Sequence, residues 1–483
     1  MRDDELLSRL PWLSVSGDRI VDDTGRTVRL TGVGLGGWMN MENFITGYPG
    51  NEENIRRVMR ERMGADAYEA FFDSFYTAFF DDADAAFIAS VGMNSVRIPV
   101  NYRHFEDDAR PFELKEEGFA RLDRVVSSLA RHGVYSIIDL HALPGRQNQH
   151  WHSDNPTHIA EFWNHPHFQD RVVHLWEALA DRYKDRPEVA GYNPINEPSD
   201  PTGVALPAFY DRLERAIRAI DQRHILFLDG NKYSTDFSFL DDRTDPLPNA
   251  VYTAHDYALP GITSATQYPG ITRGEYFDRD VVEQTFLRRT EYMRRTGTPI
   301  WIGEFGPVYS DDRSQDPWRL QLLRDQLDIY RDHGASWALW TYKDIGLQGL
   351  RYADSSSDYM VRTADVRAKK ARLGADSWGG SDAGVRDVLD PIDALFDREF
   401  PDFAPWPWGR QPHVAVLVRH ILFAEPLAEE FGAVFADVDP TQAADLARAF
   451  AFTQTVERSG LTDLLREPVT ARARARAGRS DGA

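Results

Sequence analysis

The 483-residue chain contains no cysteine, which excludes disulfide bonds, thiolate metal sites and cysteine nucleophiles. Basic residues are also few relative to acidic ones: 55 Lys and Arg stand against 76 Asp and Glu, for a formal net charge of −21. Because such a surface repels phosphate backbones and anionic lipids, we expect neither nucleic acid nor membrane as a partner. The one basic run lies in the Ala- and Gly-rich residues 468–483, which we expect to be a disordered tail.

Long apolar runs are missing as well. No stretch approaches the roughly 18 apolar residues of a membrane span, and the acidic Met1–Glu5 is not followed by an apolar run of signal-peptide length. We therefore expect a cytoplasmic protein. Aromatic residues, in contrast, make up 12% of the chain and include 12 Trp. They either fill a large core or, beside His, Asn and Asp, provide flat apolar faces for sugar rings.

Short apolar runs rich in β-branched residues alternate with amphipathic helical stretches. The expected strands are Val28–Leu35, Ser95–Pro99, Tyr135–Leu140, Val189–Pro194, Ile225–Asp229, Val251–Ala254, Ile300–Glu304 and Ser336–Tyr342. The expected helices are Glu116–His132, His167–Tyr183, Leu206–Asp221, Val281–Thr296 and Trp318–His333. Eight nearly all-apolar strands separated by helices predict an α/β fold, a closed (β/α)₈ TIM barrel. A doubly wound open sheet is the alternative, but no G-x-G-x-x-G turn opens a helix after the first strand.

Two further segments flank the predicted barrel. Arg19–Val28 has the turn chemistry of a hairpin that could close the bottom of the barrel. From about Pro401 the strand signals stop, and His413–Phe431 and Thr441–Phe452 have helical patterns. We expect a catalytic domain over residues 1–400 and a helical extension packed on it over residues 401–467. The sequence leaves the oligomeric state open.

Two of the expected strands end in a glutamate. Tyr192–Pro198 carries Glu197 at the end of the fourth strand, and Trp301–Gly306 carries Glu304 at the end of the seventh. The two residues are far apart in the sequence, so only a barrel can bring them together at its catalytic face. Two carboxylates that face each other across a sugar suit glycoside hydrolysis, in which one protonates the leaving oxygen and the other meets the developing positive charge.

The strand-end motifs resemble those of glycoside hydrolase family 5, whose members are retaining β-glycosidases on (β/α)₈ barrels. The resemblance runs from about Arg26 to Asp344, and its motifs fall in family order: Ser95-Val96-Arg97-Ile98-Pro99, Asp139-Leu140-His141, Asn196-Glu197-Pro198, His255-Asp256-Tyr257, Glu304-Phe305-Gly306 and Trp340. It implies that Glu197 is the acid/base and Glu304 the nucleophile.

Physical chemistry gives the surrounding residues roles. Glu304 must be ionised to attack, and Arg97 and the Tyr257 hydroxyl are the candidates to stabilise its charge. Glu197 must hold its proton until it donates it, so we expect partial burial and the charge of Glu304 to raise its pKa. Asn196 is suited to hold the sugar 2-hydroxyl.

The remaining candidates are substrate-binding residues. His141 and His255 could orient the sugar or Glu197, and Trp340 could form a floor beneath the sugar. In the loop Gln147–Asp154, two histidines beside an aspartate could suggest a metal, but zinc sites usually use three or more ligands at fixed spacing. With Trp151 and Trp163 nearby, we favour a sugar-binding wall there, and a similar role for Glu42 in the loop Asn40–Tyr48. We expect no metal and no cofactor.

Long loops decide the predicted mode of action. They follow strands one, three, six and eight over Gly36–Asn54, Ala142–Asn164, Tyr257–Arg273 and Lys343–Arg362. Loops of this length are usually functional, and these would wall off a pocket for one terminal sugar. We therefore expect an exo-acting, β-glucosidase-like retaining enzyme that hydrolyses small glycosides by double displacement.

Other functions remain open at this point. An endo-β-glucanase or a glycolipid-directed β-glycosidase is the alternative enzyme. A non-catalytic sugar-binding barrel would need neither carboxylate, so the presence of both glutamates argues against it. The sequence does not distinguish gluco, galacto, manno, xylo or furanosyl substrates.

Overall fold

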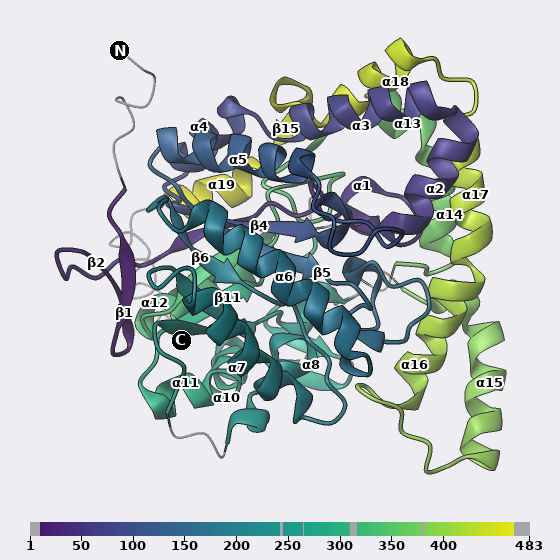
Figure 1. Cartoon of the computed structure of the whole chain (residues 1–483). Helices are drawn as coiled ribbons and strands as arrows, with labels where there is room; N and C mark the ends of the chain where they lie inside the picture. The colour runs from purple at the N-terminus through teal and green to yellow at the C-terminus, as the bar shows by residue number, and fades with distance from the viewer. Residues whose placement is uncertain are drawn as a thin grey trace.

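A computed structural model describes residues 10–467, except 242–244, 264, 310–315, 377 and 379–380. Eight parallel strands form a closed barrel (Figure 1). In order around the barrel they are β3 (Thr31–Gly34), β4 (Ser95–Asn101), β5 (Tyr135–Ala142), β6 (Val189–Asn193), β7 (Ile225–Asp229), β8 (Ala250–His255), β11 (Ile300–Glu304) and β12 (Ser336–Leu339). The predicted TIM barrel is therefore confirmed, with every expected strand in place.

Helices surround the barrel and connect its strands. They are α2 (Glu52–Met63), α3 (Ala65–Phe79) and α4 (Asp82–Ser90) before β4, and then α5 (Glu116–Arg131), α6 (Pro166–Tyr183), α7 (Ala205–Arg218), α10 (Arg279–Arg289), α11 (Glu291–Thr296) and α12 (Asp316–Asp332). The single helix expected over Val281–Thr296 is wrong. The helix is interrupted at Thr290, whose φ of −106° and ψ of 13° are not helical, and two helices result.

Glycines lie in strand β3 and directly after it because neighbouring groups leave no room for a side chain. A Cβ atom at Gly32 would lie 1.9 Å from the carbonyl oxygen of Ser95 on β4. At Gly34 it would lie 2.5 Å from the Trp340 ring, and at Gly36 it would lie 2.6 Å from the same ring. The glycines therefore allow the Trp340 indole, which follows β12, to lie directly against the first strand.

A hairpin closes the bottom of the barrel. Strands β1 (Leu13–Ser16) and β2 (Arg19–Asp22) pair antiparallel, and the side chains of Leu13 and Ile20 pack with Trp301 in the lower core. The N-terminal hairpin therefore begins earlier in the sequence than the expected Arg19–Val28. Residues 19–22 of that expected segment form its second strand, β2. The residues that follow form a turn, which a bridge between Val21 and Thr27 closes.

The chain after the barrel adds a small sheet and further helices. The sheet contains β13 (Lys343–Asp344), β14 (Arg351–Ala353) and β15 (Thr455–Glu457). The helices are α13 (Asp358–Arg362), α14 (Ala364–Arg372), α15 (Arg386–Glu399), α16 (Arg410–Val416), α17 (Ala424–Ala433), α18 (Pro440–Ala447) and α19 (Ser459–Arg466). The helix expected over His413–Phe431 is interrupted by a π-helical segment, Leu417–Leu422. The domain boundary at residue 400 stays a prediction, and the expected tail 468–483 lies outside the described residues.

Helices α17 and α18 pack on the helices that precede β4. Figure 1 shows α17 beside α2 and α18 beside α3. Aromatic rings fill this contact: Phe71 lies 6.1 Å from Phe435, and Phe75 lies 5.5 Å from Phe450, between ring centroids. Helices α17 and α18 and the residues after each of them therefore share one hydrophobic core with α2 and α3.

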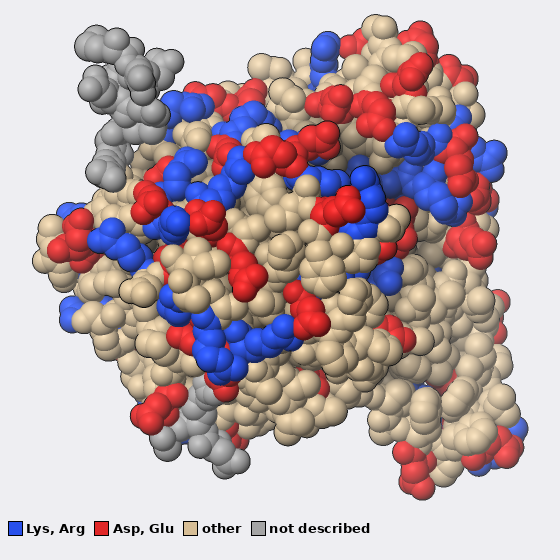
Figure 2. Space-filling view, in the orientation of Figure 1, with Lys and Arg blue, Asp and Glu red and all other residues tan. Residues whose placement is uncertain are grey.

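Acidic and basic side chains are mixed over much of the face shown in Figure 2, rather than segregated by sign. Among the helices that the structure describes, none is both long enough and apolar enough to cross a membrane.

Candidate active site

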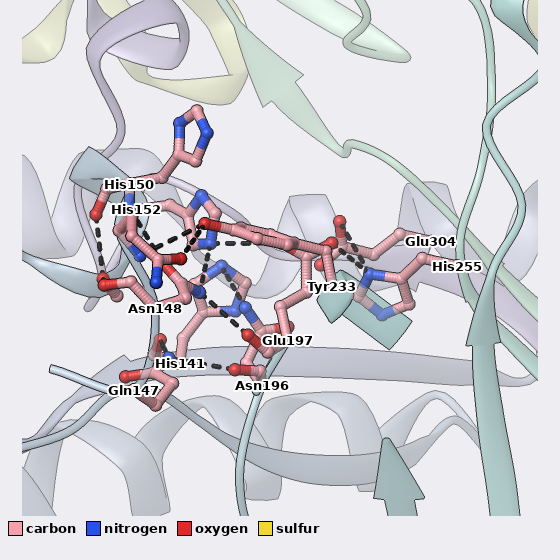
Figure 3. A network of polar contacts seen from close by, with 12 residues as sticks. His141, Gln147, Asn148, His150, His152, Asn196, Glu197, Tyr233, His255 and Glu304 are labelled. Carbon is pink, nitrogen blue, oxygen red and sulfur yellow. Dashed lines mark hydrogen bonds and ion pairs between the residues drawn. The ribbon is translucent and has the colours of Figure 1, made fainter. Parts of the chain in front are cut away.

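The two predicted glutamates meet at the carboxyl end of the barrel. Glu304 ends β11, and Glu197 follows β6 with a left-handed backbone φ of 46°. One carboxylate oxygen from each residue and one ring nitrogen of His255 all lie within 4.8 Å of one another (Figure 3). Main-chain hydrogen bonds hold Glu197 in this conformation: its N–H donates to Asp229 over 2.9 Å, and its carbonyl accepts from the Asn148 amide over 2.9 Å.

Two donors stabilise the charge of Glu304. Arg97 Nη1 lies 2.6 Å from Oε1 of Glu304, and the Tyr257 hydroxyl donates to Oε2 over 3.0 Å. Burial lowers the pKa of Arg97, but the charges of Asp139 and Glu304 outweigh it and raise that pKa. Burial, together with the charge of Glu304, holds the pKa of Tyr257 well above its usual value. Both groups thus keep their protons and donate to Glu304.

Glu197 has two imidazole neighbours. Its Oε1 lies 2.6 Å from His255 Nδ1, and its Oε2 lies 3.1 Å from His152 Nε2. Burial raises the pKa of Glu197, but the hydrogen bonds of His152 and His255 overcome it and hold the pKa well below the usual value. The expectation of a raised pKa for Glu197 is therefore wrong in this structure. It considered burial and the charge of Glu304, but not the hydrogen bond between His152 and the Glu197 carboxylate, which lowers the pKa.

The pKa of His255 shifts in the opposite direction to that of Glu197. Burial lowers its pKa, but the charges of Glu304 and Glu197 and the nearby Asp229 raise it overall. Glu197 and His255 thus form a coupled pair whose shared proton lies on the imidazole. The separation of Nδ1 and Oε1 is 2.6 Å, so this proton can return to the carboxyl group along one short hydrogen bond.

Buried polar contacts orient the floor of the site. Arg97 donates to Asn196 Oδ1 over 2.5 Å and forms a 3.1 Å ion pair with Asp139. Asp139 lies 2.7 Å from Nδ1 of His141, whose Nε2 lies 3.2 Å from the Asn196 amide nitrogen. The His141 ring stacks on Trp340 with 5.5 Å between centroids. The predicted residues Arg97, Asn196, His141 and Trp340 therefore form one network.

Glu42 enters the same site from the loop after β3. Its side chain is buried, and its Oε1 lies 3.6 Å from Nε2 of His141. Burial, with the charges of Glu304 and Glu197, raises the pKa of Glu42 well above its usual value. Oε1 has no hydrogen-bond partner among the described residues. A buried carboxyl group with an unused oxygen is suited to bind a sugar hydroxyl.

A cavity of about 410 Å³ opens over these groups. Most of the predicted residues line it: Glu42, His141, Trp151, Glu197, His255, Tyr257, Glu304 and Trp340. Arg97 and Asn196 lie beneath the surface and act on the lining groups. The alternative wall residue Trp163 is not part of the lining, because it is buried and its indole N–H donates to the carbonyl of Gln147.

Several lining residues were not predicted. They come from the segment after β7 and from the chain after the barrel: Lys232, Tyr233, Thr235, Trp378, Trp408 and His420. The expected strand-eight loop, in contrast, contributes no lining residue. The sequence signal that could have pointed to this wall is Trp406-Pro407-Trp408, an aromatic cluster next to helical segments with few other tryptophans.

The loop histidines and aspartate do not converge as a metal site. His152 contacts Glu197, whereas Asp154 accepts hydrogen bonds from Asn51 and Arg103 in a separate network. Among the described residues, Glu197, His255 and Glu304 are the group with ligand atoms close enough to share an ion. The guanidinium of Arg97, 2.6 Å from Glu304, opposes a cation there.

Known proteins resemble this chain in sequence and in fold. A family model described as Cellulase (glycosyl hydrolase family 5) matches residues 61–346. A protein named Beta-xylosidase from Phanerodontia chrysosporium is 44% identical, over 94% of this chain and 98% of its own length. Endoglucanase C of Acetivibrio thermocellus is 23% identical over 58% of this chain and 89% of its own. A crystal structure of a glycoside hydrolase, 20% identical, shares the fold with a TM-score of 0.51 and covers 66% of this chain and 90% of that chain.

Proposed function

Because the chain belongs to glycoside hydrolase family 5 and hydrolyses O-glycosyl bonds, we propose that it is a retaining, exo-acting β-glycosidase of small glycosides. The observation that carries the proposal is the approach of Glu197 and Glu304 to within 4.8 Å at their nearest oxygens. Retaining enzymes keep their carboxyl groups about 5–5.5 Å apart, whereas inverting enzymes need about 6.5–9.5 Å to admit a water.

In the first proposed step, Glu304 attacks the anomeric carbon and the bond to the leaving oxygen breaks. His255 Nδ1 returns the shared proton to Glu197, which passes it to the leaving oxygen. Arg97 and Tyr257 orient Glu304 for the attack. The product of this step is a glycosyl ester of Glu304 and a free alcohol.

In the second step, Glu197 acts as a base. It takes a proton from a water molecule, and the oxygen of that water forms a bond to the anomeric carbon while the ester bond to Glu304 breaks. The sugar leaves with its original anomeric configuration. The proton then passes from Glu197 back to His255 Nδ1, which restores the starting state of both carboxyl groups and of the imidazole.

The enclosure of the cavity supports exo-action. Lining residues come from the loops after β3, β5, β7 and β8 and from the chain after the barrel, so walls surround the glutamates. A site walled in this way accepts the end of a chain and does not accommodate the middle of a polymer. We infer that a β-glucoside or a β-xyloside occupies it; the second is favoured by the 44% identical relative named Beta-xylosidase.

A panel of nitrophenyl β-glycosides tests the sugar, and viscometry tests the mode of action. We expect hydrolysis of the β-glucoside or β-xyloside with release of the β-anomer first, observed by proton NMR. We also expect little loss of viscosity from a soluble β-glucan while reducing ends accumulate. A rapid viscosity loss with mixed oligosaccharides would favour the endo-acting alternative, and a first-formed α-anomer would exclude retention.

Substitutions test the two carboxylates separately. Glu304→Gln should abolish turnover of every glycoside, because no other group can form the ester. Glu197→Ala should still be glycosylated by substrates with good leaving groups, and added azide should restore its turnover with formation of a β-glycosyl azide. If azide instead rescued a Glu304 variant through the retained azide product, the two roles would be reversed.

A further inference from the structure

The segment between α15 and α16 reaches the mouth of the cavity, far from its neighbours in sequence. The Trp406 indole N–H donates to the Ser199 hydroxyl over 2.7 Å, and Lys232 Nζ lies 4.8 Å from the centre of the Trp406 ring. Ser199 follows β6 and Lys232 follows β7. Two barrel loops therefore anchor this segment.

The anchored segment places Trp408 in the cavity wall. Its ring lies 4.6 Å from that of Tyr233 at an interplanar angle of 31°, and 4.9 Å from that of His150. Trp408 lines the cavity and keeps 39% of its surface exposed. An indole that is held on one side and open on the other is available to a ligand at the cavity mouth.

Tyr233 is rigidly held beneath this indole. Its hydroxyl donates to Gln149 Oε1 over 2.9 Å and accepts from the Gln149 N–H over 3.1 Å. Its backbone adopts a left-handed φ of 61°, a conformation that costs energy for a residue with a side chain and is maintained where the surroundings enforce it. The two aromatic rings thus form a fixed surface.

The position of Glu197 identifies the part of the substrate that this surface meets. Glu197 follows β6, and Tyr233 follows the adjacent strand β7, whereas Glu42 follows β3 on the opposite side of the eight-stranded barrel. Figure 3 shows the Tyr233 ring above Glu197, near His150 and His152. Since an acid that protonates the leaving oxygen lies next to the leaving group, the Tyr233 side of the cavity faces the leaving group.

We propose that Trp408, carried by the C-terminal extension, forms with Tyr233 the binding site for the leaving group of the glycoside. The site selects leaving groups with a flat apolar face, which is provided by an aryl ring or by a second pyranose. This inference rests on the proposed retaining hydrolysis and adds a residue outside the segment matched by the family model, residues 61–346. Glu42, His141 and Trp340 are then left to hold the sugar that is cleaved.

The test compares leaving groups on one sugar. For the sugar that the panel selects, kcat/KM is measured with its methyl glycoside, its phenyl glycoside and its β-linked disaccharide. In Trp408→Ala the ratio of the phenyl or disaccharide value to the methyl value should fall about tenfold relative to the wild type, the effect expected from losing one aromatic contact. Trp408→Phe, which keeps a flat ring, should restore most of the ratio.

Phe403→Ala is the matched control. Phe403 lies in the same segment and is 43% exposed, but its ring contacts Phe396 and His413 and does not line the cavity. This variant should leave the ratio unchanged. If Trp408→Ala does not fold, as judged by circular dichroism, Trp408→Leu keeps apolar volume without a flat ring and replaces it in the test.

The outcomes are distinct. A falling ratio for the phenyl glycoside alone assigns the site to aryl leaving groups, and a falling ratio for the disaccharide alone assigns it to a second sugar. An equal loss on all three substrates, or no change in any ratio, overturns the proposal. If the wild type hydrolyses none of the substrates, it is the proposed function that fails.

Discussion

Glu197 illustrates what a strand-end motif predicts and what it omits. The apolar run before it and the Asn-Glu-Pro sequence were enough to predict its position, and the barrel brings it to Glu304 as expected. Its protonation could not be predicted in the same way. His152, which holds its pKa down, approaches from a loop whose path depends on contacts such as the hydrogen bond from Asn40 to the His152 carbonyl.

His152→Ala should shift the alkaline limb of the pH profile upward. Glu197 must carry a proton when it protonates the leaving oxygen, so kcat/KM falls as the pH rises through the pKa of the Glu197–His255 pair. Removal of His152 removes a hydrogen bond that lowers the pKa of Glu197, and that pKa rises. We expect a shift of about one pH unit, the order of magnitude of a hydrogen bond to a charged group.

The measurement is kcat/KM against pH with a substrate whose leaving group needs protonation. His158→Ala is the matched control, because His158 lies in the same loop and contacts the carbonyl of Gln149 without lining the cavity. An alkaline limb that stays in place, or moves to lower pH, in His152→Ala would contradict the role given to His152.

At the scale of elements, the strands were the most predictable part. Their apolar runs reflect burial on both faces, so the limits of β7 and β11 match the sequence expectation. Breaks within helices were less predictable. The interruption at Thr290 and the π-helical Leu417–Leu422 depend on packing between distant segments, for example His420, which stacks on Trp151 with 4.0 Å between ring centroids.

A buried ion pair links several elements, and its removal should destabilise the fold. Lys343 on β13 contacts Asp84 on α4 over 2.7 Å, the Phe79 carbonyl over 2.7 Å and the Phe450 carbonyl over 2.8 Å. Lys343→Ala would leave the charge of Asp84 buried without its partner, at a cost of about 3–5 kcal/mol. Urea unfolding followed by circular dichroism measures this loss.

Two comparisons make this prediction specific. Replacing both partners, Lys343→Met with Asp84→Leu, should recover much of the stability, because no unpaired charge remains. Arg57→Ala, which breaks the exposed 2.9 Å pair with Glu61, should have a far smaller effect. Equal losses from the buried and the exposed pair would show that the Lys343 contacts do not hold these elements together.

At the scale of the whole molecule, the segment after the barrel contacts the barrel and its site more extensively than the sequence suggests. The helical patterns after Pro401 predicted an extension, but no local pattern could show that it lines the cavity or that β15 pairs with β14. These contacts join residues more than a hundred positions apart, and only the folded chain brings them together. The cytoplasmic location and the expectation that nucleic acid is not a partner stay predictions.

A chain that ends at residue 400 should not fold stably. It would lack Phe435 and Phe450, which pack on α3, and each loss of a buried aromatic costs about 3–5 kcal/mol against a typical total stability of about 5–15 kcal/mol. We expect an insoluble product or one without a cooperative thermal transition. A chain that ends at residue 467 is the control and should keep the full-length melting temperature. A soluble, cooperatively melting 400-residue product would show that the extension is dispensable for folding.

The placement of Trp408 and His420 after the whole barrel in the sequence has a consequence for synthesis. Proteins leave the ribosome from their N-terminus, so all eight barrel strands, complete at Leu339, emerge well before the last wall of the cavity. Both glutamates are already present in such a nascent chain, but the cavity is open on the side of Tyr233. Full hydrolytic competence is thus delayed until His420 has emerged, and a nascent chain that ends before Trp408 lacks the wall that completes the site.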